Sequence, residues 1–78
     1  MNEQEIMDMI KEMTILDESE EVKESDVLFD LGIDSLKLVE VIVSIEMRYD
    51  IEFSDTELSP SEIITVEDII SLTRKYVA

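Results

Sequence analysis

Three segments of this 78-residue chain place apolar residues at intervals of three and four positions. That spacing gathers the apolar side chains on one face of an α-helix, whereas a half-buried strand would show strict alternation. The segments span residues 3–16, 35–50 and 66–77, and only "YDIEF", near residue 50, is ambiguous. The sequence therefore predicts an all-α fold in which three longer helices bury their apolar faces against one another.

Residues suited to capping mark where two of these helices begin. Asn2 with Glu5, and Thr65 with Asp68, have the three-residue spacing at which a cap and an acid satisfy each other's backbone N–H groups. These pairs predict that the first helix starts just after Asn2 and the last one just after Thr65.

A shorter helix is predicted between the second and third long ones. Ser59 has the character of a cap, Pro60 suits the first helical position, and Glu62 follows three residues after the cap. This pattern is typical of a helix of one or two turns. Together the elements predict a small four-helix bundle with three longer helices, one short helix and a long first loop.

The long first loop covers residues 17–34, where helical periodicity fails. Apolar residues are nevertheless scattered through this acidic segment, and we expect them to anchor it to the core: Val22, Val27, Leu28, Phe29, Leu31 and Ile33. Connections of this length without regular structure are often functional. The loop is therefore a candidate part of the functional site.

The predicted helix over residues 35–50 carries two apolar stripes roughly 140° apart. One consists of Leu38, Ile42, Ile45 and Tyr49, and the other of Leu36, Val39, Val43 and Met47. Both stripes could lie in the core. Alternatively, the second stripe, which is flanked by Glu40, Glu46 and Asp50, could meet a partner that has an apolar groove and a basic rim. The periodicity alone leaves both interpretations open.

The charge balance narrows the choice of partners. Acidic residues outnumber basic ones 21 to 6, which gives a net charge of −15. Such a charge repels nucleic acid phosphates and anionic lipid headgroups, so we expect neither nucleic acid nor membrane as a partner. The chain starts without the features of a signal peptide and has no apolar run of membrane-spanning length. We therefore expect a cytoplasmic monomer that binds proteins with basic docking surfaces.

The composition also argues against a self-contained enzyme. Histidine and cysteine are both absent, which removes the commonest general base, disulfides and cysteine metal sites. We expect residues 1–78 to form one small domain, and a chain of this size leaves no room for a deep cleft. An EF-hand calcium site fails on spacing because no D-x-D-x-D-G loop occurs, so no metal site is expected.

Ser35 stands where the long loop gives way to the second helix. A serine or aspartate in that position is most often a helix cap. Asp34 and Ser35 have no histidine nearby, and Lys37 lies on another face of the helix, so Ser35 has no base to make it a nucleophile. A phosphate attached to its hydroxyl would, however, lie beside free backbone N–H groups and the positive end of the helix dipole. Ser35 is thus a plain cap or a site that another enzyme modifies.

The stretch "LFDLGIDSL", residues 28–36, resembles the signature of acyl and peptidyl carrier proteins. The resemblance extends to the chain length, the acidic balance, the order of helices and the opening "ITVEDII" of the last helix. It implies that Ser35 carries 4′-phosphopantetheine, transferred from coenzyme A by a separate phosphopantetheinyl transferase. It also implies that Asp34 helps the transferase and its Mg²⁺ to engage, and that Gly32 permits a close approach to the helix.

The resemblance implies a function as well. Acyl or aminoacyl intermediates would be held as thioesters on the arm and shuttled between loading enzymes, synthases and transferases of fatty acid, polyketide or nonribosomal peptide assembly. The second helix would be the recognition element, with these candidate docking residues: Leu36, Val39, Glu40, Val43, Glu46 and Met47. Carriers of fatty acids can also take the chain between their helices, and the methionines of the first helix would suit such a soft core, although they are equally ordinary core residues.

One alternative from another class remains. An acidic helical interaction module with Ser35 as a plain cap has the same composition and periodicity. It predicts that Ser35→Ala costs about 1 kcal/mol of stability and nothing else. The carrier hypothesis predicts that the same substitution abolishes modification.

Overall fold

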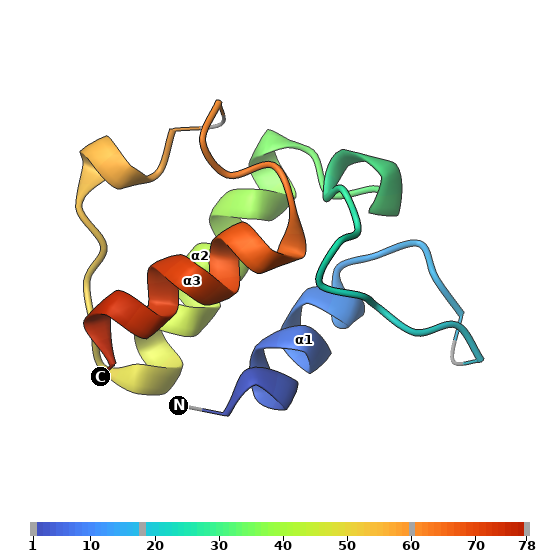
Figure 1. The fold of residues 1–78 in the computed structure, drawn as a ribbon, viewed down its shortest axis with the longest axis horizontal. Coiled ribbons are helices and arrows are strands. Elements are labelled where there is room, and N and C mark those ends of the chain that lie inside the picture. Colours follow the sequence, from blue (N-terminus) through green and yellow to red (C-terminus); the bar gives the residue numbers. More distant parts are fainter. Residues whose placement is uncertain (1, 18, 60, 78) are drawn as a thin grey trace.

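The computed structural model describes residues 2–17, 19–59 and 61–77. Within them the α-helices are α1 (Glu3–Glu12), α2 (Ser35–Tyr49) and α3 (Val66–Tyr76). Helix α1 packs against both α2 and α3, and both chain ends lie near the C-terminal end of α2 (Figure 1). The described residues form no strand, only an isolated bridge between Val27 and Thr65. The predicted all-α bundle is confirmed.

The core is aliphatic and draws on all three helices. Its fully buried side chains are Ile6, Ile10, Ile45, Ile69, Ile70, Val41, Val66 and Thr73. Thr73 is the polar member, and its hydroxyl donates a hydrogen bond of 2.8 Å to the carbonyl of Ile69, so burial leaves it satisfied. None of the helices in the described residues is both long and apolar enough to cross a membrane.

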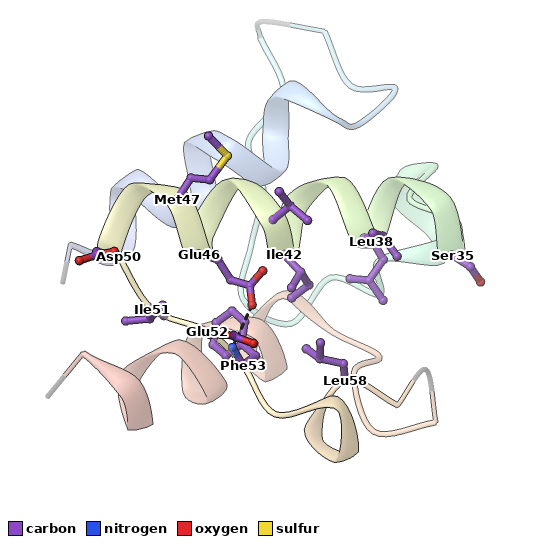
Figure 2. A pocket seen from close by; sticks show the side chains of 12 residues that line it. Ser35, Leu38, Ile42, Glu46, Met47, Asp50, Ile51, Glu52, Phe53 and Leu58 are labelled. Carbon is purple, nitrogen blue, oxygen red and sulfur yellow. Dashed lines mark hydrogen bonds between the residues drawn. The ribbon is translucent and has the colours of Figure 1, made fainter.

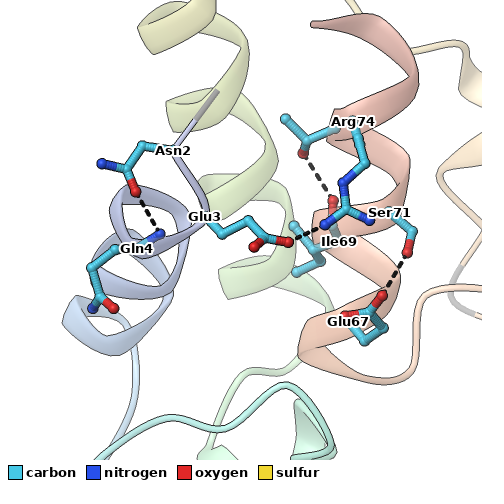
Figure 3. Close-up of polar contacts among 8 residues, drawn as sticks. Asn2, Glu3, Gln4, Glu67, Ile69, Ser71 and Arg74 are labelled. Atoms are coloured by element: carbon cyan, nitrogen blue, oxygen red, sulfur yellow. Dashed lines mark hydrogen bonds and ion pairs between the residues drawn. The ribbon is translucent and has the colours of Figure 1, made fainter. Parts of the chain in front are cut away.

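The two predicted N-terminal caps, of α1 and α3, make different hydrogen bonds. Thr65 and Asp68 form the full reciprocal capping box at the start of α3. Asn2 caps α1 by accepting from the N–H of Gln4 at 2.9 Å (Figure 3), but the carboxylate of Glu5 binds residues of α2 instead. Helix α1 also ends earlier than expected, at Glu12, since the chain turns there and the hydroxyl of Thr14 bonds to a carbonyl of the last turn.

The short helix is displaced from its predicted position. A 3₁₀ turn covers Asp55–Glu57, before the expected start. At Ser59 the chain makes only a turn, in which the N–H groups of Glu62 and Ile63 donate to the Ser59 carbonyl. Pro60 lies outside the described residues. The segment between Ser59 and α3 has room for only a single turn, because Ile63 is buried in the core and Thr65 already caps α3.

Four of the six predicted anchors hold the long loop to the core, Val27 is only half-buried, and Phe29 is an exception. Val22, Leu28, Leu31 and Ile33 are buried, but Phe29 is 77% exposed, so its assignment as an anchor was wrong. A 3₁₀ turn over Phe29–Leu31 explains the difference. In such a turn side chains three residues apart share a face, so Leu28 and Leu31 point inward together while the intervening side chain points elsewhere.

Gly32 ends this turn in the left-handed conformation, with φ of 85°. A Cβ atom built on it would lie 2.7 Å from Cγ2 of Ile15. The N–H of Ile15 also donates to the carbonyl of Leu31, at 3.0 Å. Glycine is therefore required by the backbone conformation, and the segment after α1 lies directly against it.

The helix ends farthest from Ser35 are joined by charged and hydroxyl side chains, and we call this region the paired end. It comprises Glu3, Glu5, Arg48, Tyr49, Glu57, Arg74, Lys75 and Tyr76. Glu5 accepts from Arg48 and from the hydroxyl of Tyr49, both at 2.7 Å, and Glu3 pairs with Arg74 (Figure 3). Each of these contacts joins residues far apart in sequence.

These contacts shift the titration of the groups involved. The hydroxyl of Tyr49 and the guanidinium of Arg48 stabilise the carboxylate of Glu5 and lower its pKa. Burial and the same hydrogen bond raise the pKa of Tyr49. The Glu5–Tyr49 contact therefore needs an ionised carboxylate and a protonated phenol.

Candidate functional site

The cap of α2 is Asp34, and Ser35 is the first helical residue. An oxygen of the Asp34 side chain accepts from the N–H of Lys37 at 2.9 Å, and the Asp34 carbonyl accepts from Leu38 at 2.8 Å. The Ser35 side chain is exposed, and its hydroxyl has no hydrogen bond to any described residue. Ser35 is therefore not the cap, which removes the structural role that competed with modification.

Main-chain hydrogen bonds position the residues around Ser35, and we call this region, residues 28–38 with 63–66, the attachment end. The N–H of Leu28 donates to Ile64 at 2.9 Å, and the carbonyl of Leu28 accepts from Ile33 at 3.1 Å. The second bond folds the loop back just before α2. As a result, Ser35 lies at the surface and Ile33 lies in the core.

The environment of Ser35 fits a phosphopantetheine group. Its hydroxyl is exposed and unbonded, and the first N–H groups of a helix have no partner within that helix. A phosphate ester on Ser35 would lie beside these donors and at the positive end of the α2 dipole. No side chain among the described residues has to move to free the oxygen.

The second stripe of α2 lies on the surface. Leu36 is 71% exposed, Val39 56%, Val43 43% and Met47 79%. The interpretation that placed both stripes in the core is therefore wrong. Val41, which belongs to neither stripe, is fully buried.

The two candidate docking acids lie in different settings. Glu40 is exposed, whereas Glu46 is half-buried and its carboxylate accepts from the N–H of Phe53 at 2.9 Å. The carbonyl of Glu46 also accepts from Asp50 and Ile51. Glu46 therefore holds the chain that follows α2, and its carboxylate is already engaged.

A groove of about 640 Å³ runs along α2 from Ser35, between the helix and the residues Ile51, Glu52, Phe53 and Leu58. Figure 2 shows Ser35 at one end, the Glu46 carboxylate turned towards Phe53, and Asp50 at the other end. Its lining is formed by Ser35, Leu38, Val39, Ile42, Val43, Glu46, Met47, Asp50, Ile51, Glu52, Phe53 and Leu58. The sequence did not predict that Ile51, Glu52, Phe53 and Leu58 line this groove, since only the folded chain brings them opposite α2.

The methionines of α1 do not line this groove. Met7, Met9 and Met13 pack against the core instead, which favours the ordinary structural interpretation of these residues. A smaller groove of about 230 Å³ also reaches Ser35, from the side of the loop, and its lining includes Phe29 and Ile64. Ser35 thus stands where two apolar grooves meet.

Comparison with known proteins identifies the family. The family model described as "Phosphopantetheine attachment site" matches residues 4–72. The chain belongs to this family. Its members are carriers rather than enzymes and bear 4′-phosphopantetheine, so the family, cofactor and non-enzyme predictions are confirmed.

Several relatives are similar over nearly the whole chain. An acyl carrier protein of Coprothermobacter proteolyticus is 38% identical over 69 residues, which cover 88% of this chain and 82% of the relative. An acyl carrier protein of Thermotoga maritima is 34% identical over 90% of this chain and 84% of its own. One from Clostridium acetobutylicum is 32% identical, covering 94% and 92%. The interaction-module alternative agrees with neither these matches nor the position of the cap.

Proposed function

We propose that this protein carries acyl groups on a 4′-phosphopantetheine arm attached to Ser35, and delivers them to enzymes of fatty acid or related assembly. The observation that carries the proposal is the hydroxyl of Ser35, which is exposed and unbonded because Asp34 caps the helix in its place. Residues 1–78 act as one carrier domain, a cytoplasmic monomer. The names of the relatives favour acyl over aminoacyl cargo.

Attachment is a phosphoryl transfer performed by a separate transferase. The Ser35 oxygen forms a bond to the phosphorus that bears pantetheine, the bond from that phosphorus to the nucleotide oxygen of coenzyme A breaks, and the serine proton passes to a base of the transferase. The departing product is the 3′,5′-bisphosphate of adenosine. Asp34 precedes Ser35 in the chain, and its carboxylate oxygen that does not cap α2 would help the transferase's Mg²⁺ to engage. When bound, the group supplies a flexible thiol for the acyl cargo.

Partner enzymes would dock on the exposed stripe of α2. Leu36, Val39, Val43 and Met47 offer apolar contact area, and Glu40, which pairs with no described residue, adds a negative charge beside them. The net charge of −15 steers the carrier towards partners with basic surfaces and mainly raises association rates. Glu46 contributes less to docking, since its carboxylate already accepts from Phe53.

The test is intact-protein mass spectrometry after incubation with coenzyme A, Mg²⁺ and a promiscuous phosphopantetheinyl transferase. We expect the parent protein to gain the mass of one phosphopantetheine and Ser35→Ala to gain none. Ser44→Ala is the matched control, because Ser44 lies on the same helix away from the attachment end, and it should be modified as the parent is.

Stability measurements separate this result from misfolding. Because Asp34 rather than Ser35 caps α2, Ser35→Ala should change the free energy of unfolding by less than about 0.5 kcal/mol. Modification of Ser35→Ala, or a folded parent protein that gains no mass, would overturn the proposal. A loss of about 1 kcal/mol would instead point to a capping role.

A further inference from the structure

We propose that the partner surface which docks on the exposed stripe of α2 is charged in two halves. It carries basic groups along the side that faces the groove, and a carboxylate opposite Lys37, at the end next to Ser35. The inference rests on the proposed function, because it assumes that partners dock on this stripe. It goes beyond attraction by the net charge, since it states in which orientation a partner fits.

The charged residues of α2 lie along two edges of the stripe. Glu46 and Asp50 lie on the side that faces the groove, and we call this side the groove edge. With about 100° per residue, Lys37, Glu40 and Arg48 fall on the opposite side of the stripe. We call that side the α1 edge, because Arg48 forms its ion pair with α1.

The groove edge is acidic. Glu52, on the segment after α2, lies beside Glu46 and Asp50, and none of the described residues that line the groove is basic (Figure 2). The carboxylate of Glu46 is engaged by the N–H of Phe53, but Asp50 and Glu52 are exposed. This edge therefore offers negative charge to basic groups of a partner.

The α1 edge is different, because Lys37 gives it a positive charge at the end beside Ser35. Lys37 is half-buried and forms no ion pair with a described residue, whereas Arg48 is paired with Glu5 at 2.7 Å. Glu40, one turn beyond Lys37, is exposed and has the opposite charge. The α1 edge is thus close to neutral as a whole and positive at the attachment end.

The first turn of α2 departs from the pattern of the other two helices. The positive end of the helix dipole favours acids in a first turn, and α1 and α3 each carry two there. The first turn of α2 carries none and holds Lys37. The cap Asp34 bonds to the backbone N–H of Lys37 and forms no ion pair with its ammonium group. Helix stability therefore does not account for this lysine, whereas contact with an acidic group of a partner does.

The two edges select an orientation. A partner docked the other way round would place its basic groups against Lys37 and its carboxylates against Asp50 and Glu52, and such like-charge contacts are penalised. Because Ser35 lies at one end of the stripe, the orientation decides at which end of the partner's docking surface the arm emerges. The edges would thus direct the arm towards the partner's active site.

Two synthetic peptides test the inference on the full chain. Both form a helix with leucines on one face, glutamates along one edge and lysines along the other, and they differ only in that the two edges are exchanged. On the stripe, this exchange is equivalent to reversing the direction of the peptide. A nitroxide on the peptide N-terminus broadens nearby amide resonances, so it should broaden Leu36 with one peptide and Met47 with the other. We expect each peptide to prefer its direction by roughly threefold to tenfold, as exposed charge pairs at two edges would give.

Lys37→Glu tests the residue directly. It makes both edges acidic, so the preference for one direction should fall below about twofold with both peptides. A glutamate in the first turn suits the helix dipole, so the variant should keep its fold, and Lys37→Gln removes the positive charge alone. Lys23→Glu is the matched control, because it makes the same change of charge at an exposed lysine of the long loop, and it should keep the parent's preference.

Three results would overturn the inference. They are broadening at the same end of α2 with both peptides, a preference that Lys37→Glu leaves unchanged, and peptides that leave the resonances of the stripe unshifted. Failure of Ser35 to accept phosphopantetheine would instead contradict the proposed function. Mass spectrometry measures that step separately, so the two failures are distinguishable.

Discussion

The two ends of α2 are held by different kinds of contact. At the paired end, side chains of opposite charge and phenol hydroxyls join the ends of the three helices, as in the contacts of Glu5 with Arg48 and Tyr49. At the attachment end, the described residues form no ion pair, and main-chain hydrogen bonds and helix caps do the holding.

This difference has a functional consequence. Side-chain pairing beside Ser35 would occupy or screen the hydroxyl that, under the proposed function, a modifying enzyme has to reach. Backbone bonds such as that from Leu28 to Ile64 position the loop without using any side chain at the surface. The comparison teaches that, in the described residues, contacts between two side chains lie away from the residue proposed to be modified, and only a capping contact to the backbone lies beside it.

The largest effect is expected from a change to the backbone of the attachment end. Gly32→Ala should lower the free energy of unfolding by roughly 1–3 kcal/mol, since alanine is strained at a φ of 85°. Urea denaturation measures the loss. The double variant with Ile15→Ala separates conformation from contact: Ile15 is 74% exposed and can move aside, so its removal should not rescue stability. Full rescue would show that the close contact, and not the backbone, is the constraint.

A smaller effect is expected at the cap of α3, which also belongs to the attachment end. Thr65→Ala should cost about 1 kcal/mol, because the N–H of Asp68 loses its acceptor. Thr56→Ala is a suitable control, since the exposed Thr56 hydroxyl bonds to Ser54, two residues away in the chain, and caps no helix. Equal losses in the two variants, measured by urea denaturation, would argue that caps do not hold this end.

The capping box of α3 also makes the stability of the protein sensitive to acid, through the carboxyl of Asp68. Burial raises the pKa of Asp68, but hydrogen bonds from the backbone of Thr65 and Ile64 and from the Thr65 hydroxyl outweigh it, so the net pKa is lowered. A carboxyl whose folded pKa is lowered stabilises the protein above its unfolded pKa, and that contribution disappears as the pH falls through the folded value.

The smallest loss of stability is expected from changes at the paired end, and its size depends on pH. The pKa of Glu5 is lowered by Tyr49 and Arg48, so the contact stabilises the fold at neutral pH and is lost as the pH falls below about 4.5. Glu5→Gln should therefore lower the melting temperature slightly at pH 7 and flatten its decline in acid. Glu12→Gln, which alters an exposed glutamate of the same helix, is the control.

Measurements at alkaline pH test the contribution of the Tyr49 phenol to stability. Because the pKa of Tyr49 is raised, its contribution is present at neutral pH and is lost only as the pH rises through the folded pKa, above 10. Tyr49→Phe should remove that alkaline decline. A larger loss at neutral pH from Tyr49→Phe than from Gly32→Ala would reverse the proposed ranking of the two ends.

The sequence by itself determined the elements that depend on local interactions. The three helices, the capping box at Thr65 and the position of Ser35 at a helix start follow from short-range spacing. Local physics is sufficient there because periodicity and capping involve residues within one or two turns of each other.

Only the tertiary structure decided which faces are covered. Nothing local distinguishes the two stripes of α2, and the exposure of Met47 and Phe29 depends on where distant segments pack. The partners of Glu5 likewise lie 43 and 44 residues away in the sequence, and the partner of Glu46 lies 7 residues away. Whether Asp34 or Ser35 caps α2 was also decided in the fold, because both residue types cap well and the choice depends on how the loop enters the helix.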